Sequence, residues 1–157
     1  MGWPFCIKIG AGVKEMKKVL LGLVLLVSGI QVASAQPAQL ALGIWADEDG
    51  ESNIEIARCG AALCGRVIWL KSPNDESGQP RTDVNNPDVG QRRRPVLGLT
   101  ILSGLQPEDD SQLKGQVYNA EDGNVYEVYL TPQRATMEVE GCFAFILCGS
   151  QTWTRVK

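Results

Sequence analysis

The sequence predicts an all-β protein, built as a small antiparallel up-and-down β-barrel or a closely related sandwich. Apolar and polar residues alternate with a period of two in several short segments after residue 40, as expected for strands with one buried face. Gly, Asn, Asp and Pro residues separate these segments, and helical periodicity is scarce. Seven or eight short strands joined mainly by hairpin turns are therefore expected.

Each expected strand ends at a recognisable turn. The first strand, Leu42–Trp45, is followed by the acidic turn Asp47–Gly50, and Glu121–Asn124 is a strong hairpin signal further along the chain. The other strands are expected at Ser52–Arg58, Cys64–Leu70, Leu113–Tyr118, Val125–Leu130, Thr136–Glu140 and Gln151–Val156. Leu97–Leu105 is expected to form a short strand or a helical turn.

The N-terminal 35 residues are expected to lie outside this domain. A basic start at residues 16–18 precedes the apolar run Val19–Ile30, and small residues then lead to Ala35, which is typical of a signal peptide. Residues 1–15 are interpreted as an upstream extension from start-codon choice, and an uncleaved membrane anchor is the alternative. The prediction is a periplasmic or secreted bacterial protein, cleaved after Ala35, with one mature domain at residues 36–157.

Composition excludes several classes of function. Removal of residues 1–35 takes away four of the 15 basic residues and one of the 18 acidic residues, which leaves a net charge of −6. Such an acidic domain is a poor candidate for nucleic-acid binding. The chain has no histidine, so His-based triads and His-ligated zinc are excluded. No cofactor, metal or later transmembrane segment is expected.

The mature part contains four cysteines, Cys59, Cys64, Cys142 and Cys148. Export would place them in an oxidising compartment, so disulfides are preferred over a zinc site. Each neighbouring pair brackets a short segment, and opposed residues across a hairpin lie at a separation that suits a disulfide. Pairings 59–64 and 142–148 are favoured, while a crossed pairing between the two hairpins stays open.

The barrel interior could be filled or open. Trp45, Trp69 and Trp153 fall on the apolar phase of their strands, so a structural, buried role is expected for them. With the Ile, Val and Met residues of the same faces they could fill a small barrel. Strand glycines favour the opposite result because they leave room or permit sharp bends; these are Gly65, Gly115 and Gly141. An eight-stranded barrel can accommodate either arrangement.

The segment from Lys71 to Gly98 is a long polar loop between two expected strands, and loops of this length are usually functional or disordered. One interpretation is a self-bonded Ω-loop, held by Asx turns and an Arg–Asp pair. A second is a lid or rim whose arginines grip an anionic group. A third is a calcium site at 83–88, although the glycine and glutamate of an EF-hand are missing. The candidate ligand-binding residues are Asn74, Asp75, Asp83, Asn85, Arg93 and Arg94.

Two resemblances support the barrel. Gly43-Ile44-Trp45 and the late Arg155 beside Trp153 resemble the lipocalins and other calycins, in which a G-x-W tryptophan closes one end of the barrel under an arginine. Over nearly the whole mature chain, the sequence resembles the bacterial domain of unknown function 2147 family. The matching segments are GIW at 43–45, CGAALCGRVIWLK at 59–71, PND at 73–75, TDVNNPD at 82–88, RRRPVLGL at 92–99 and QTWTRV at 151–156.

The family resemblance implies an exported, lipocalin-like barrel without an established activity. We therefore expect a small-ligand binder, for an apolar or anionic molecule, with the long loop at its mouth. The alternative is a filled barrel that contacts an envelope protein or the cell wall, and the apolar segment Phe143–Leu147 could dock on a membrane or such a partner. No enzyme and no catalytic residue is proposed, because acidic residues such as Glu55 and Glu127 fall on the solvated phase of their strands.

Overall fold

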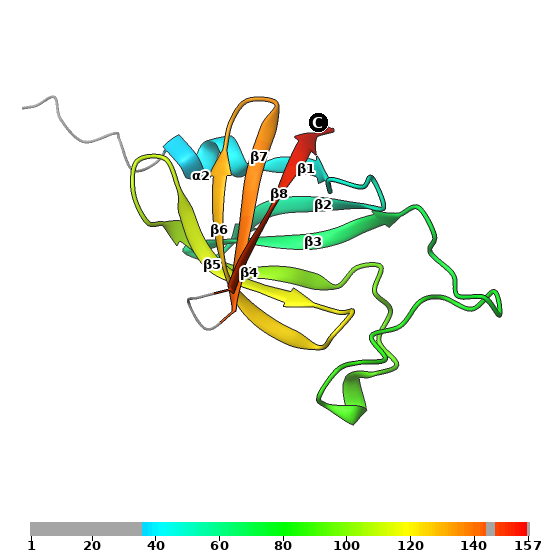
Figure 1. Cartoon of the computed structure of the whole chain (residues 1–157). Coiled ribbons are helices and arrows are strands. Elements are labelled where there is room, and N and C mark those ends of the chain that lie inside the picture. Colours follow the sequence, from blue (N-terminus) through cyan, green and yellow to red (C-terminus); the bar gives the residue numbers. More distant parts are fainter. Residues whose placement is uncertain (1–35, 144–146, 157) are drawn as a thin grey trace, which may run out of the picture. The chain divides into compact units, whose positions relative to one another are not determined.

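The computed structural model describes residues 36–143 and 147–156, and in this part eight antiparallel strands close into a barrel in the order β1 to β8 (Figure 1). The strands are β1 (Gly43–Ala46), β2 (Ser52–Cys59), β3 (Ala62–Leu70), β4 (Thr100–Pro107), β5 (Leu113–Asn119), β6 (Asn124–Pro132), β7 (Thr136–Phe143) and β8 (Leu147–Arg155). Each strand pairs with its sequence neighbour, and β1 pairs with β8 to complete the ring. The predicted up-and-down barrel is confirmed.

Two short helical segments accompany the strands. The helix α2 (Gln36–Ala41) precedes β1, and the 3-10 helix η2 (Val89–Gln91) lies within the long loop between β3 and β4. Sequence reasoning missed α2, because six residues are too few to show helical periodicity. The expected signal peptide and the centre of the apolar segment Phe143–Leu147 lie outside the described residues.

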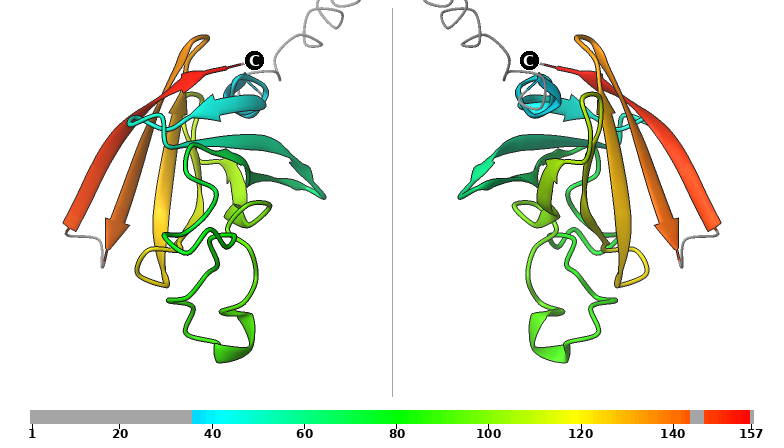
Figure 2. Two further views of the ribbon diagram at one scale, coloured as in Figure 1. Left: turned by 90° about the vertical axis from the view of Figure 1, so that its right-hand side faces the viewer. Right: turned by 90° about the vertical axis from the view of Figure 1, so that its left-hand side faces the viewer.

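The alternating strand directions give the barrel two different ends. At the closed end, α2 contacts β4 and β6, and the turns at 60–61, 108–112 and 133–135 lie there. At the open end lie the turn at 47–51, the loop at 71–99 and the turn at 120–123. Figure 2 shows the green loop and the yellow β5–β6 turn at one end and α2 with the orange β6–β7 turn at the other.

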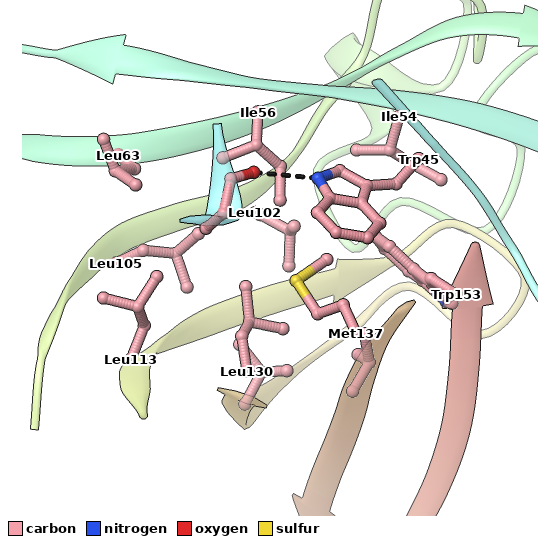
Figure 3. Packing of buried hydrophobic residues seen from close by; sticks show 13 residues of the cluster. Trp45, Ile54, Ile56, Leu63, Leu102, Leu105, Leu113, Leu130, Met137 and Trp153 are labelled. Atoms are coloured by element: carbon pink, nitrogen blue, oxygen red, sulfur yellow. Dashed lines mark hydrogen bonds between the residues drawn. The ribbon is translucent and has the colours of Figure 1, made fainter. Parts of the chain in front are cut away.

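The closed end is packed with apolar side chains around Trp45, which is fully buried (Figure 3). The indole Nε1 of Trp45 donates a hydrogen bond to the carbonyl oxygen of Ala41 at 2.8 Å, so α2 is tied to the core. Side chains from seven of the strands complete the cluster: Ile54, Ile56, Leu63, Leu102, Leu105, Leu113, Val128, Leu130, Met137, Val139 and Trp153.

Arg155 covers the closed end from β8. Its guanidinium carbon lies 4.1 Å from the ring centroid of Trp45, a cation–π contact worth about 0.5–2 kcal/mol. Its nitrogens also donate hydrogen bonds to the carbonyl oxygens of Leu40, Leu42 and Arg134. Arg155 thus joins α2, the start of β1 and the β6–β7 turn, which is the arrangement that the lipocalin resemblance implied.

The expectation of a buried Trp69 is wrong. Its side chain is 45% exposed, although Gly65 and Val67 on the same phase of β3 are buried. The register explains the difference: Asn53 pairs with Trp69, but Ile54 pairs with Val67, so one residue of β3 is bulged out of the ladder. Because a bulge reverses the alternation of side chains beyond it, Trp69 faces outward.

The cysteines pair within their hairpins, as favoured from the sequence. Cys59 and Cys64 form a disulfide across the β2–β3 turn, and Cys142 and Cys148 form one between β7 and β8. The Cα atoms of the two pairs are 5.8 Å and 4.1 Å apart. Among the described residues, no helix combines the length and apolar character needed to cross a membrane.

Candidate functional site

The open end of the barrel encloses a cavity of about 960 Å³. Its inner wall is apolar and includes Ile54, Val67, Val128, Val139 and Trp153. Four of them, Ile54, Val128, Val139 and Trp153, also belong to the packed core cluster, so the cavity adjoins the filled part of the barrel. A concave apolar site of this size is typical of pockets that hold a small molecule.

Two glycines widen this cavity. Gly141 on β7 and Gly149 on β8 face each other across the ladder, and both line the cavity. A Cβ atom added to either glycine would have no atom of the described residues within 4 Å. The room that glycines were expected to leave is therefore present at Gly141, and Gly149 adds to it.

The other two predicted strand glycines do not leave open space. A Cβ atom on Gly65 would lie 2.6 Å from Cδ1 of Leu102, and one on Gly115 would lie 2.7 Å from the carbonyl oxygen of Ser103. In both places the absence of a side chain lets neighbouring strand β4 approach closely. These glycines therefore contribute to the filled part of the barrel.

The loop between β3 and β4 is ordered around one buried carboxylate, Asp83. Asp83 is fully buried, and its Oδ2 accepts hydrogen bonds of 2.8 Å from Arg94 Nε and Asn86 Nδ2. Arg94 Nη2 forms an ion pair with the same oxygen at 2.8 Å, and Oδ1 accepts a 2.7 Å hydrogen bond from the Tyr118 hydroxyl. We call Asp83, Asn86, Arg94 and Tyr118 the Asp83 latch, because Tyr118 lies on β5 and the other three lie on the loop.

Electrostatics keep this latch charged at neutral pH. Burial raises the pKa of Asp83, but hydrogen bonds from Tyr118, Asn86 and Arg94 outweigh burial, so the pKa lies below its ordinary value. Burial and the Asp83 carboxylate both raise the pKa of the Tyr118 hydroxyl, which therefore remains a donor. The Arg94 guanidinium also lies 5.3 Å from the Tyr118 ring centroid. Within the latch, both oxygens of Asp83 accept hydrogen bonds, and Asn86, Arg94 and Tyr118 donate them.

A second contact fixes the loop to the β5–β6 hairpin. Asn85 Nδ2 donates a 2.7 Å hydrogen bond to the carbonyl oxygen of Glu121. The carbonyl oxygen of Asn85 also comes so close to Gly123 that an added Cβ would lie 2.0 Å from it. Gly123 has a φ of 75°, a conformation that favours glycine. The backbone of the loop thus packs directly against the backbone of the β5–β6 turn.

The predicted ligand-binding residues separate into two groups. Asp75 and Asn85 line the cavity, whereas Asn74, Asp83, Arg93 and Arg94 do not lie in its described wall. Asp83 and Arg94 are occupied with each other in the latch. Asn74 belongs to a small bridge with Pro80, and Arg93 is exposed.

Two of the three clustered arginines are bonded within the loop, and none of the three belongs to the described cavity wall. Arg92 Nε donates a 2.7 Å hydrogen bond to the Asn86 carbonyl oxygen, and Arg94 binds Asp83. Asp88 caps η2 by accepting a 2.9 Å hydrogen bond from the backbone N–H of Gly90. With both Asp83 oxygens bonded to donors and Asp88 bonded to the backbone, the segment 83–88 does not present the set of oxygens that the calcium interpretation required.

Charged residues at the rim were not identified from the sequence. Asp47, Asp49 and Glu51 from the β1–β2 turn line the cavity, as do Arg81 from the loop and Glu121 from the β5–β6 hairpin. In the sequence these residues look like ordinary solvated turn residues. Only the closure of the barrel brings these three segments, which are distant in the sequence, to one mouth. The rim could therefore have been predicted only from the order and direction of the strands in the closed barrel.

Residues 43–155 match the model of DUF2147, a family described as an uncharacterized protein conserved in bacteria. The chain belongs to the DUF2147 family. The match begins at the G-x-W strand and ends at Arg155, so it covers the whole ring of strands in this DUF2147 barrel.

A solved structure shares the architecture. Protein HP1028 from the human pathogen Helicobacter pylori, described as belonging to the lipocalin family, superposes with a TM-score of 0.64 at 21% sequence identity. The superposition covers 74% of this chain and 82% of HP1028. At this level of identity the likeness shows a lipocalin-like fold. No protein with curated functional information matches the chain.

Proposed function

We propose that this DUF2147 protein is an exported binding protein that holds a small molecule in the open end of its barrel. The cavity of about 960 Å³ is the observation that carries the proposal, because its inner wall is apolar while its rim is polar. An apolar wall favours the body of a small organic molecule, and rim groups supply orientation and specificity. The lipocalin-like fold is compatible with this use.

The cavity favours ligand binding over a filled interaction module. The packed cluster around Trp45 occupies the closed end, and the wall formed by Val128, Val139 and Trp153 separates it from open space. A barrel that served only as a rigid module would be expected to fill its interior throughout, since protein interiors are close-packed. Gly141 and Gly149 instead keep side-chain volume away from the mouth.

The proposal is binding without catalysis. The acidic residues considered for carboxylate chemistry, Glu55 and Glu127, alternate with core residues on β2 and β6 and therefore face away from the interior. Glu55 forms a 3.2 Å ion pair with Arg66, and Glu127 forms a 3.0 Å ion pair with Lys114. Hydrogen bonds from Tyr129 and Lys114 lower the pKa of Glu127, which suits a structural ion pair better than a general acid.

Native mass spectrometry of protein purified from its native compartment tests the binding function. We expect a mass excess that disappears after denaturing extraction, together with a small molecule in the extract. The matched variants are Gly141→Leu, which places a side chain in the cavity, and Thr152→Leu, which changes an exposed position of β8. Gly141→Leu should lose the bound molecule and Thr152→Leu should keep it. Identical, ligand-free masses for the native protein would contradict the function.

Export is supported by the two hairpin disulfides, which persist in oxidising compartments. The signal-peptide pattern before Ala35 supports it further. The same mass measurement provides a test, because the mature protein should begin at Gln36 and carry two fewer hydrogens for each disulfide. A full-length mass would contradict cleavage after Ala35, and free thiols in freshly isolated protein would contradict export.

A further inference from the structure

We propose that the cavity selects amphipathic molecules with a positively charged head group, which lies at the acidic rim while the apolar body enters the barrel. This inference rests on the proposed binding function and specifies its ligand class. It differs from the expectation of an anion held by the arginines of the loop. The distribution of charge around the open end carries it.

Acidic side chains dominate the rim. Five carboxylates line the cavity: Asp47, Asp49, Glu51, Asp75 and Glu121. Among the described residues of the cavity wall, Arg81 is the one cation. Lys71 pairs with Glu51 at 2.7 Å, so three negative charges remain even when Lys71 and Arg81 are both counted. These carboxylates come from three separate segments and surround the mouth from several sides.

The three arginines at 92–94 do not belong to the described wall of the cavity. Arg94 is bound to Asp83, and Arg92 is bound to the Asn86 backbone, so both are held within the loop. Neither belongs to the cavity wall among the residues described there. The charge of Arg94 is therefore balanced by Asp83 within the loop, and the residues that line the mouth remain acidic on balance.

The wall beneath the rim suits the rest of such a ligand. Ile54, Val128 and Val139 form an apolar floor, and Trp153 and Tyr126 add aromatic surface next to it. Aromatic rings attract cations through their negative faces. An apolar cavity with carboxylates of one sign at its entrance also concentrates the field of those charges, because the low-dielectric wall screens them less than water does. A cationic amphiphile matches both parts, whereas an anionic one meets repulsion at the rim.

Three probes with the same ten-carbon chain test this selectivity: decyltrimethylammonium, decanoate and 1-decanol, each as a monomer at neutral pH. Isothermal titration of the ligand-stripped mature protein at low ionic strength should show decyltrimethylammonium binding about tenfold more tightly than decanoate. The neutral alcohol should lie between them. The preference should shrink as salt is added, since salt screens exposed charges.

Charge-neutralising variants give the matched comparison. Asp49→Asn combined with Glu121→Gln removes two rim charges and should reduce the preference several-fold. Glu108→Gln combined with Asp110→Asn removes two charges from the β4–β5 turn at the closed end and should leave the preference unchanged. Equal binding of the three probes, abolished by Gly141→Leu, would overturn the charge selectivity while the binding function stands. Failure of all three probes to bind would count against both.

Discussion

The two ends of the barrel are built from the same alternating strands but are stabilised in different ways. At the closed end, Trp45 packs among aliphatic side chains and Arg155 covers it through one ring contact and several backbone carbonyls. At the open end, the described residues line a cavity, and a polar latch around Asp83 holds a long loop against β5. Apolar burial thus organises one end, and directional hydrogen bonds organise the other.

This difference places stability and binding in separate parts of one small domain. The closed end can supply cohesion without a ligand, because its contacts are made within the chain. The open end keeps apolar wall accessible, and the latch compensates by ordering the loop with bonds that do not fill the cavity. Variants at the mouth are therefore expected to alter binding or loop mobility more than the fold.

The largest loss of stability is expected from Trp45→Ala. Removing the fully buried indole leaves a cavity beneath Arg155 and breaks the bond to Ala41, so the free energy of unfolding should fall by about 3–5 kcal/mol. Trp69→Ala is the control, because Trp69 is 45% exposed, and it should change stability by less than about 1 kcal/mol. Urea denaturation followed by circular dichroism measures both. Equal losses would refute the assignment of the closed end as the main core.

Asp83→Asn should have the next largest effect, concentrated at the open end. The substitution keeps the shape but replaces one acceptor oxygen with an NH2 group that faces the donors of the latch, at an expected cost of about 2–3 kcal/mol. Hydrogen exchange should increase at the amides of residues 81–98 while strands at the closed end stay protected. The exposed Asp110→Asn should change neither pattern. Faster amide exchange throughout the barrel would show that the latch stabilises the whole domain and not only the loop.

Two glycine substitutions compare the filled and open halves directly. Gly115→Ala forces a Cβ against the carbonyl oxygen of Ser103 and the Cα of Leu105, so stability should fall by about 1–2 kcal/mol. The Cβ of Gly141→Ala meets no atom of the described residues, so this variant should be neutral, or stabilised by about 0.5 kcal/mol through a less flexible unfolded chain. Thermal melts of the two variants beside the parent measure the contrast. A destabilised Gly141→Ala variant would show that this wall is packed.

The smallest expected effect is on acid stability. The pKa of Asp83 is lowered in the folded state, so its contribution is present above the unfolded pKa near 4 and is lost as pH falls through the folded value. Burial opposes the hydrogen bonds, which keeps the net contribution small. Between pH 5 and pH 3 the parent should therefore lose slightly more stability than Asp83→Asn. If chemical denaturation gave the same pH dependence of the unfolding free energy for the parent and for Asp83→Asn, Asp83 would not be a source of acid sensitivity.

Much of the barrel was predictable because strand patterns and turns are local. The alternation around Ile54 and Ile56, the hairpin at Glu121–Asn124 and the cysteine spacings require only neighbouring residues to interpret. The exposure of Trp69 was not predicted, because the bulge that turns it outward depends on the register between β2 and β3. The sequence of β3 alone does not specify that register. The helix α2 was not predicted, because its six residues are too few to show helical periodicity.

The candidate site was less predictable because its parts are far apart in the chain. The composition of the loop correctly suggested Asx turns and an Arg–Asp pair, but Tyr118, which lies 35 residues after Asp83, completes the latch from another strand. The acids of three turns form one rim only when β1 and β8 close the ring.

The sequence by itself predicted most of the strands and favoured the hairpin disulfides, since each depends on short-range pattern and chemistry, and the lipocalin resemblance indicated the residues that close one end. Only the tertiary structure decided that the described part of the barrel has a cavity at one end and that acidic residues line its mouth. It also decided that the loop arginines are held within the loop. The physical reason is that cavity volume and electrostatic sign are sums over residues that only the closed fold brings together.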